Sequence, residues 1–257
     1  YTTLFRSVVF GAGTEQETAL TPVGEKSVFL ARYDNIGQLE WVVDLCIDGT
    51  ISSGGNLFDV QLAENGDLLI SGGFRGAMLA GDGDSAVYKE VEEWGLFLAR
   101  YTADGARVWT RVASSDGTGG GLFSGEFFGV TELHDGALVA AGSMNGTTTF
   151  APGEPNELAL EGNSITNYDG VLAAYSADGD FQWALEQGGL SWDFYTGVAR
   201  FPGEPPVQDI LIAGGIFSHN VVFGTGGDDV LGVWATEPYD GEWFSYPACY
   251  DIFLQRL

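Results

Sequence analysis

The stretch Phe29-Leu-Ala-Arg-Tyr-Asp-Asn-Ile-Gly-Gln-Leu-Glu-Trp41 decides the fold, because the chain repeats it with variations. The second copy is Phe97-Leu-Ala-Arg-Tyr-Thr-Ala-Asp-Gly-Ala-Arg-Val-Trp109, and the third is Val171-Leu-Ala-Ala-Tyr-Ser-Ala-Asp-Gly-Asp-Phe-Gln-Trp183. A fourth copy begins at Ile252-Phe-Leu-Gln-Arg-Leu257. Successive tyrosines of the complete copies are 68 and 74 residues apart. Repeats of this length indicate an architecture built from like structural units.

A second stretch recurs between these copies. Its forms are Phe58-Asp-Val-Gln-Leu-Ala-Glu-Asn-Gly-Asp-Leu-Leu-Ile-Ser-Gly-Gly-Phe74, Phe128-Gly-Val-Thr-Glu-Leu-His-Asp-Gly-Ala-Leu-Val-Ala-Ala-Gly-Ser-Met144, and a third running from Tyr195-Thr-Gly-Val-Ala-Arg200 to Ile210-Leu-Ile-Ala-Gly-Gly-Ile216. Both kinds of stretch read as β-hairpins. Asn65-Gly66, Asp104-Gly105, Asp135-Gly136 and Asp178-Gly179 predict type I′ turns, because these dipeptides accept positive φ at both central positions.

A short apolar piece follows the second kind of hairpin in each unit. The pieces are Ala77-Met-Leu79, Thr148-Thr-Phe150 and Val221-Val-Phe223, and Val8-Val-Phe10 matches them, so we expect the chain to begin partway through a unit. Four strands with apolar residues on both faces form a sheet that needs a similar sheet on each side.

Radial stacking of such sheets predicts an all-β fold, a β-propeller fragment of about four blades. The expected division is a partial blade at 8–53 and blades at 54–121, 122–190 and 191–257, in a ring left open with exposed sheet faces and edges.

These motifs carry a family resemblance. Phe-Leu-Ala-Arg-Tyr-Asp, the turn glycine, Leu-x-Trp, the Asn-Gly hairpin and Ser-Gly-Gly-Phe together resemble the bacterial SBBP-type β-propeller repeats. The Ala-Arg-Tyr-x-x-Asp-Gly part is also similar to the delta-60 repeats. The resemblance implies a large secreted or cell-surface protein, and its motifs specify architecture rather than activity. The first seven residues, Tyr1-Thr-Thr-Leu-Phe-Arg-Ser7, look like a translated sequencing adapter, and we exclude them from the fold prediction.

The composition restricts the function. The 257 residues include 36 Asp and Glu against ten Lys and Arg, for a formal net charge of -26. Without a basic stripe we expect no nucleic-acid partner, and without a long apolar run we expect no membrane insertion. Cys46 and Cys249 form either one disulfide or two separate thiols. With only His134 and His219 besides, a zinc site is not expected.

Two repeat positions are interpreted as structural. Arg32, Arg100 and Arg256 occupy one position and Ala174 replaces them in the third copy. They either satisfy carboxylates and carbonyls between blades or form a ring that binds an anion. Trp41, Trp109 and Trp183 read as packing anchors of the outer strands.

Two sets of residues are candidate sites outside the repeat. Asp82, Asp84, Asp228 and Asp229 could supply oxygens to calcium, although none completes a recognised calcium loop. Trp234, Tyr239, Trp243 and Tyr246 lie in an aromatic, acidic insertion before the last strand. That insertion is either a contact for a glycan or protein, or a loop packed on itself over the propeller rim.

No catalytic residue set is evident, and no cofactor is expected, with calcium as the alternative. The sequence therefore predicts a non-enzymatic module that serves as a protein- or glycan-binding platform or a structural spacer. The alternative is an enzyme or cofactor-binding propeller. It is motivated by the Tyr-x-x-x-Gly-x-x-x-Trp spacing, which is similar to quinoprotein blades, and by the many carboxylates available for glycoside hydrolysis.

Overall fold

The chain is all-β. The computed structural model describes residues 7–21, 28–45, 54–85, 87–116, 125–162, 168–189, 192–201, 210–217, 220–223, 231–234 and 251–256. Within these ranges every strand pair is antiparallel, and one short 3-10 helix is present. In the described part, no helix has the length and apolar character needed to cross a membrane.

The strands fall into four groups in chain order, which we call the first to fourth units. The first holds β1 (Val8–Phe10), β2 (Thr18–Leu20), β3 (Phe29–Tyr33) and β4 (Leu39–Asp44). The second holds β5 (Gly54–Leu62), β6 (Leu68–Asp82), the helix η1 (Gly83–Ser85), β7 (Val87–Tyr101) and β8 (Arg107–Ser115). The third holds β9 (Glu126–Glu132), β10 (Leu138–Met144), β11 (Thr147–Phe150), β12 (Leu158–Glu161), β13 (Asp169–Tyr175) and β14 (Phe181–Gln187). The fourth holds β15 (Phe194–Phe201), β16 (Ile210–Phe217), β17 (Asn220–Phe223), β18 (Leu231–Trp234) and β19 (Asp251–Arg256).

The units share one plan. The second and third have four main strands in the orders β5-β6-β7-β8 and β9-β10-β13-β14, the fourth has β15-β16-β19, and the first has β3-β4. The hairpins β1–β2, β11–β12 and β17–β18 confirm three of the four short apolar strands. The fourth prediction is wrong, because residues 77–79 are the continuation of β6 rather than a separate strand.

The tight turns are hairpins as predicted, but of a different type. Gly66 N donates to Ala63 O at 2.9 Å, and Ala63 N donates to Asp67 O at 2.8 Å. Gly66 has φ of 88°, whereas Asn65 keeps a negative φ. This is a type I turn followed by a left-handed glycine in a G1 bulge, not a type I′ turn. The loop is one residue longer than a type I′ loop, so only its last residue needs positive φ. The same two hydrogen bonds recur at the turns that end in Gly37, Gly105, Gly136 and Gly179.

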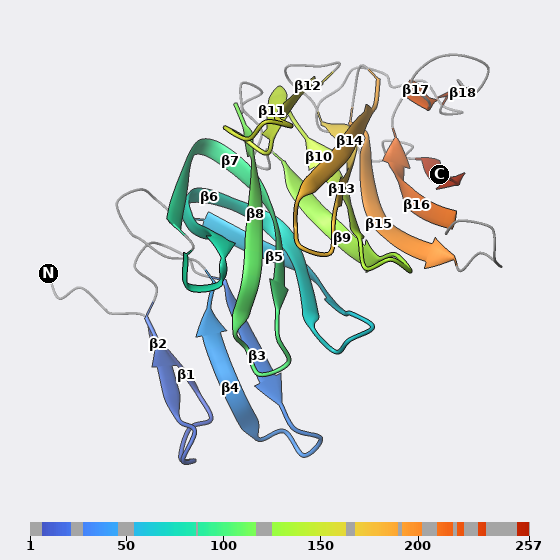
Figure 1. Cartoon of the computed structure of the whole chain (residues 1–257). Coiled ribbons are helices and arrows are strands. Elements are labelled where there is room, and N and C mark those ends of the chain that lie inside the picture. The colour runs from blue at the N-terminus through green and yellow to red at the C-terminus, as the bar shows by residue number, and fades with distance from the viewer. Residues whose placement is uncertain are drawn as a thin grey trace, which may run out of the picture.

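The sheets stack face to face in chain order, as Figure 1 shows for β3–β4, β5–β8, β9–β14 and β15–β16. We call the face of a sheet toward the preceding unit its N-face, and the opposite face its C-face. In β7, Phe97 and Ala99 on the N-face pack with Leu30 of the first unit. Leu96 and Leu98 on its C-face pack against the third unit. Further clusters join the third and fourth units through Leu172 and Ala213, among others. The prediction that a unit lies between two others is confirmed for the second and third units.

Two of the repeat tryptophans hydrogen-bond the unit that follows their own. Trp41 Nε1 donates to Ala103 O of the second unit at 3.2 Å, and Trp109 Nε1 donates to Ala177 O of the third unit at 3.1 Å. Both acceptors lie in the turn after the repeat tyrosine, whose glycine leaves room for the ring. A Cβ on Gly179 would lie 2.8 Å from the Trp109 ring. Trp41, Trp109 and Trp183 all contribute to the clusters between sheets, so their interpretation as packing anchors is confirmed.

The repeat arginines are also structural where their side chains are described. Arg32 Nη1 donates to Ala103 O of the second unit at 2.6 Å and pairs with Glu40 in its own unit. Arg100 pairs with Asp67 at 2.8 Å and with Glu132 of the third unit at 3.6 Å. The interpretation that they satisfy carbonyls and carboxylates between sheets is therefore confirmed for these two. The side chain of Arg256 lies outside the described part.

We expect Trp109 to stabilise the protein through two contributions that can be measured separately, its indole hydrogen bond and its apolar packing. Trp109→Phe removes one hydrogen bond and should lower the free energy of unfolding by about 1 kcal/mol. Trp109→Ala also leaves a cavity and should cost about 3–5 kcal/mol. Urea unfolding of both variants tests this, and equal losses in the two variants would contradict it.

Gly142 and Gly197 make a matched pair of strand glycines. A Cβ at Gly142 would lie 1.9 Å from Glu126 O, whereas a Cβ at Gly197 would meet nothing within 4 Å. We expect Gly142→Ala to prevent folding or to cost more than about 4 kcal/mol, since two backbones approach there. Gly197→Ala should change stability by less than about 1 kcal/mol. Thermal unfolding of the two proteins is the measurement, and similar midpoints would refute the close approach.

Candidate functional site

The second unit departs from the plan of the others at one place. In the third unit a separate hairpin, β11–β12, follows β10, and β11 pairs with β8 of the second unit. In the second unit β6 and β7 instead continue as strands of 15 residues each. Gly76 and Gly81, with φ of 96° and 117°, permit the bends that curl this hairpin back. Its end reaches β8, where Gly81 pairs with Thr110 and Asp82 with Trp109.

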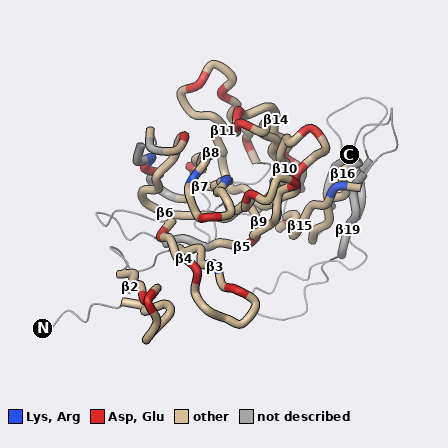
Figure 2. The backbone as a smooth tube through the Cα atoms, turned by 60° about the horizontal axis from the view of Figure 1, so that its bottom comes forward, with Lys and Arg blue, Asp and Glu red and all other residues tan. Residues whose placement is uncertain are grey.

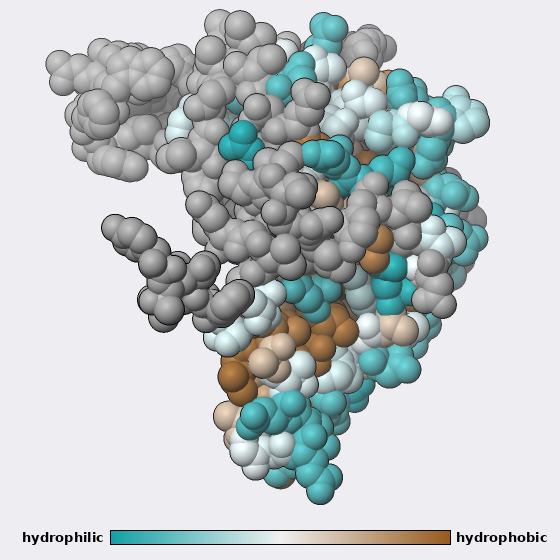
Figure 3. All heavy atoms as spheres, turned by 90° about the vertical axis from the view of Figure 1, so that its left-hand side faces the viewer, coloured by the Kyte–Doolittle hydropathy of each residue, from teal (hydrophilic) through white to brown (hydrophobic). Residues whose placement is uncertain are grey.

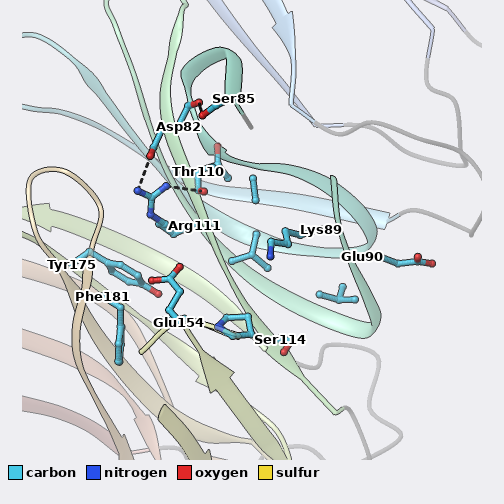
Figure 4. Close-up of a pocket in the computed structure, with 16 residues that line it drawn as sticks. Asp82, Ser85, Lys89, Glu90, Thr110, Arg111, Ser114, Glu154, Tyr175 and Phe181 are labelled. Atoms are coloured by element: carbon cyan, nitrogen blue, oxygen red, sulfur yellow. Dashed lines mark hydrogen bonds and ion pairs between the residues drawn. The ribbon is translucent and has the colours of Figure 1, made fainter. Parts of the chain in front are cut away.

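The curled hairpin encloses a cavity of about 400 Å³. Its other walls are β8, the turn between β11 and β12, and the start of β14 with the end of β13. Apolar side chains, among them Val91, Val112, Tyr175 and Phe181, line part of it. Figure 4 shows the polar side chains Asp82, Lys89, Arg111 and Glu154 around the same space. Pockets of this size and mixed lining are typical small-molecule sites.

Arg111 holds the hairpin end to the third unit. Its Nη2 pairs with Asp82 Oδ1 at 2.7 Å, its Nε donates to Gly179 O at 2.8 Å, and Nη2 also donates to Asp178 O at 3.0 Å. The guanidinium carbon lies 5.4 Å from the centre of the Trp109 ring. A positive charge is thereby fixed in the cavity wall, with most of its donors already used.

Two further contacts close the hairpin end. Ser85 Oγ donates to Asp82 O at 2.8 Å, and Arg107 Nη2 donates to Gly83 O at 2.6 Å. The helix η1 is therefore held from within and from β8. We infer that the cavity roof is a defined structure rather than an unsupported loop.

Tyr175 is the most buried polar residue of the cavity. Its ring packs edge-on to Phe181, 5.6 Å between centres, and Figure 4 shows its hydroxyl on the side of Glu154. Burial raises the pKa of Tyr175, the Arg111 charge opposes that rise and the Glu154 carboxylate adds to it. The hydroxyl therefore stays neutral at physiological pH.

Lys89, Glu90 and Glu154 also line the cavity, and all three are exposed. Basic residues are scarce in this chain, yet five of its ten lie on β6–β8, namely Arg75, Lys89, Arg100, Arg107 and Arg111. Figure 2 shows acidic residues spread over the sheets and the basic ones concentrated near β6–β8. The cavity thus offers a cation, a carboxylate and a phenol within one recess of an otherwise acidic surface.

The structure places only some of the site residues that were predicted from the sequence. Asp82 lines the cavity, but one of its oxygens is engaged by Arg111. Asp84 lies in η1, and Trp234 lies in β18, where only the backbone is described. Asp228, Asp229, Tyr239, Trp243 and Tyr246, like Cys46 and Cys249, lie outside the described residues. Within the described ranges, no group of three or more His, Cys, Asp or Glu side chains could hold a metal ion.

The sequence interpretation missed the cavity, although a signal was present. The first and third units carry a seven-residue turn after the short strand, Gly11-Ala-Gly-Thr-Glu-Gln-Glu17 and Ala151-Pro-Gly-Glu-Pro-Asn-Glu157. In each, the closing glutamate accepts a hydrogen bond from the turn glycine, Gly13 N at 2.7 Å and Gly153 N at 2.6 Å. The second unit lacks this turn, which marks the place where its hairpin is built differently.

Comparisons with known proteins add no family. No protein-family model matches the chain, and no curated protein matches it significantly.

The neutral Tyr175 hydroxyl predicts a loss of stability in alkali. The folded state holds this proton more tightly than the unfolded chain, in which tyrosine ionises near pH 10. The stability it contributes is therefore complete below about pH 10 and is lost as the pH rises further. We expect the free energy of unfolding to fall less steeply above pH 10 in Tyr175→Phe than in the wild type. Urea unfolding from pH 8 to 11 measures this, with Tyr33→Phe as a control for loss of an exposed phenol. Equal slopes in Tyr175→Phe and the wild type would contradict the prediction.

Proposed function

We propose that the chain is part of a β-propeller and serves as a non-enzymatic binding module of a secreted or cell-surface bacterial protein. The stacking of successive antiparallel sheets supports the propeller, because each unit meets the next through the same faces and the first two interfaces share the same tryptophan contact. The resemblance of the repeat to SBBP-type sequences supports the location. Arg32, Arg100 and Trp109 make contacts between sheets, which supports a structural role for these repeat positions.

The binding function belongs to the cavity of the second unit. The observation that carries this proposal is the mixed lining of the cavity, where the neutral phenol of Tyr175 borders the same space as the charged side chains of Lys89 and Glu154. A phenol hydroxyl can both donate and accept a hydrogen bond, so it can bond a polar ligand in this space. Lys89 and Glu154 lie at the same cavity and provide a donor and an acceptor.

A sugar suits this lining best. Each hydroxyl of a sugar both donates and accepts, so it can bond a phenol, an ammonium and a carboxylate in one site. The volume of about 400 Å³ is in the range of sites for small ligands. We infer that the ligand is the terminal part of a glycan, with Lys89 favouring a sugar that carries a carboxylate.

The test is binding of a panel of neutral and acidic sugars, followed by NMR or calorimetry. We expect an acidic sugar to bind, and Lys89→Ala and Glu154→Gln each to weaken it at least about tenfold, without loss of thermal stability since both side chains are exposed. Glu161→Gln, an exposed glutamate of β12 outside the cavity, is the matched control and should bind as the wild type does.

Other outcomes point to other functions. Binding that survives both cavity variants but is lost in Trp243→Ala would assign recognition to the aromatic insertion. Release of hydrolysed sugar, abolished by Asp82→Asn, would replace the binding module with the enzyme alternative. Absence of any sugar binding would leave the spacer role.

A further inference from the structure

One edge of β8 is paired at both ends but not in the middle. Along the other edge, β8 pairs with β7 from Arg107 to Ser115. On the edge away from β7, the end of β6 reaches as far as Thr110, and β11 begins at Ser114. Among the strands that the structure describes, none pairs with residues 111–113 on this edge. The sheet therefore has a gap of three residues, which we call the β8 gap.

The β8 gap lies in the wall of the cavity. Arg111 and Val112 within it, and Thr110 and Ser114 at its ends, all line the cavity. Every second residue of an antiparallel strand directs its N–H and C=O to the same edge, so residues 111–113 include at least one backbone donor and acceptor that point away from β7. Because β6 and β11 occupy the edge on both sides, a small group fits the gap, whereas a whole strand does not.

The side chains around the β8 gap include an apolar group. Ala80, Val91, Val112 and Phe181 line the same cavity. Hydrophilic residues predominate among the described ones on the side of the molecule in Figure 3, apart from an apolar area near the first unit. The cavity thus combines backbone hydrogen-bonding groups with apolar contacts that could bury a methyl group.

The charges at the cavity restrict which nitrogen-bearing group fits the β8 gap. Arg111 lies within the gap, and its guanidinium is held in the cavity wall by Asp82 and Gly179. This fixed positive charge disfavours a protonated amine beside it. A neutral amide has no such penalty. Lys89 lies on the hairpin wall, on β7, and attracts a carboxylate to another part of the cavity.

We propose that the sugar bound in the cavity is an acidic sugar that carries an acetamido group, and that this group binds the β8 gap. An acetamido group has one N–H and one C=O, as a peptide unit does, so it can pair with the free backbone groups of a strand edge. Its methyl group meets the apolar side chains, while the carboxylate of the sugar binds Lys89. The inference rests on the proposed sugar site and specifies which sugar that site takes.

The experiment compares two pairs of sugars whose members differ in one substituent. The first pair is 2-acetamido-2-deoxyglucuronate and glucuronate, and the second is N-acetylneuraminate and its analogue with a hydroxyl in place of the acetamido group. Calorimetry with the whole chain measures their affinities. We expect the acetamido member of at least one pair to bind about tenfold more tightly or better, since it gains hydrogen bonds and a buried methyl group.

Lys89→Ala separates recognition of the carboxylate from recognition of the acetamido group. This variant should weaken both members of the preferred pair, because both carry the carboxylate. The ratio of their affinities should change by less than about twofold, because the two groups bind different walls of the cavity. A preference that disappears in Lys89→Ala would assign the acetamido group to Lys89 and overturn its placement at the β8 gap.

Hydrogen exchange followed by NMR locates the acetamido group directly. We expect the exchange of at least one backbone amide within residues 111–113 to slow when the acetamido sugar binds, and to slow less with the hydroxyl analogue. Amides of β16 in the fourth unit are the internal control and should exchange at the same rate with either sugar. Equal protection of residues 111–113 by both sugars would contradict the proposal.

The comparison distinguishes failure of this inference from failure of the sugar site itself. If the acidic sugars bind but the two members of each pair have equal affinity, the sugar site stands and the acetamido preference is overturned. If none of the four sugars binds, the proposed sugar site fails, and this inference fails with it.

Discussion

Every sheet in the middle of this protein has two apolar faces, and that constraint governs the rest of the structure. The alternation in β7 sends Phe97 and Ala99 one way and Leu96 and Leu98 the other, so neither face can be left in water without a large loss of hydrophobic stabilisation. Stacking is therefore obligatory. The bonds from the Trp41 and Trp109 indoles to the next turn set the register of the first two interfaces, because a donor between sheets needs its acceptor at one fixed place.

The charge distribution follows from the same constraint. The interior of the stack is apolar, so the acids of this chain lie mainly at turns and edges, where water solvates them. The few basic residues are placed where backbone carbonyls or carboxylates of two units meet, as with Arg100 and Arg111. The arginines therefore act as ties between units, and their concentration in the second unit makes its cavity locally less acidic.

The hairpins, three of the four short strands and the mutual burial of sheets were predictable from the sequence, because glycine positions and alternating apolar residues reflect local physics. The turn type was not, since Asn65-Gly66 serves both a two-residue and a three-residue loop, and the choice depends on strand register. The cavity was not either. Asp82, Arg111 and Tyr175 are 29 and 64 residues apart in sequence and meet only because β6 and β7 curl back onto β8. The sequence did indicate that a site specific to this protein would lie where one unit departs from the repeat.

The pairing of β11 with β8 has a consequence for how the gene can be rearranged. The sheet of the second unit is extended by strands that are encoded within the third, so the unit repeated in the sequence and the unit of hydrogen bonding do not coincide. Excising residues 54–116 would take a sheet without its last two strands and leave β11 without its neighbour. A boundary after β12 would separate β10 from β13, which pair in the sheet of the third unit, so the second and third units are exchanged with least disruption as one piece.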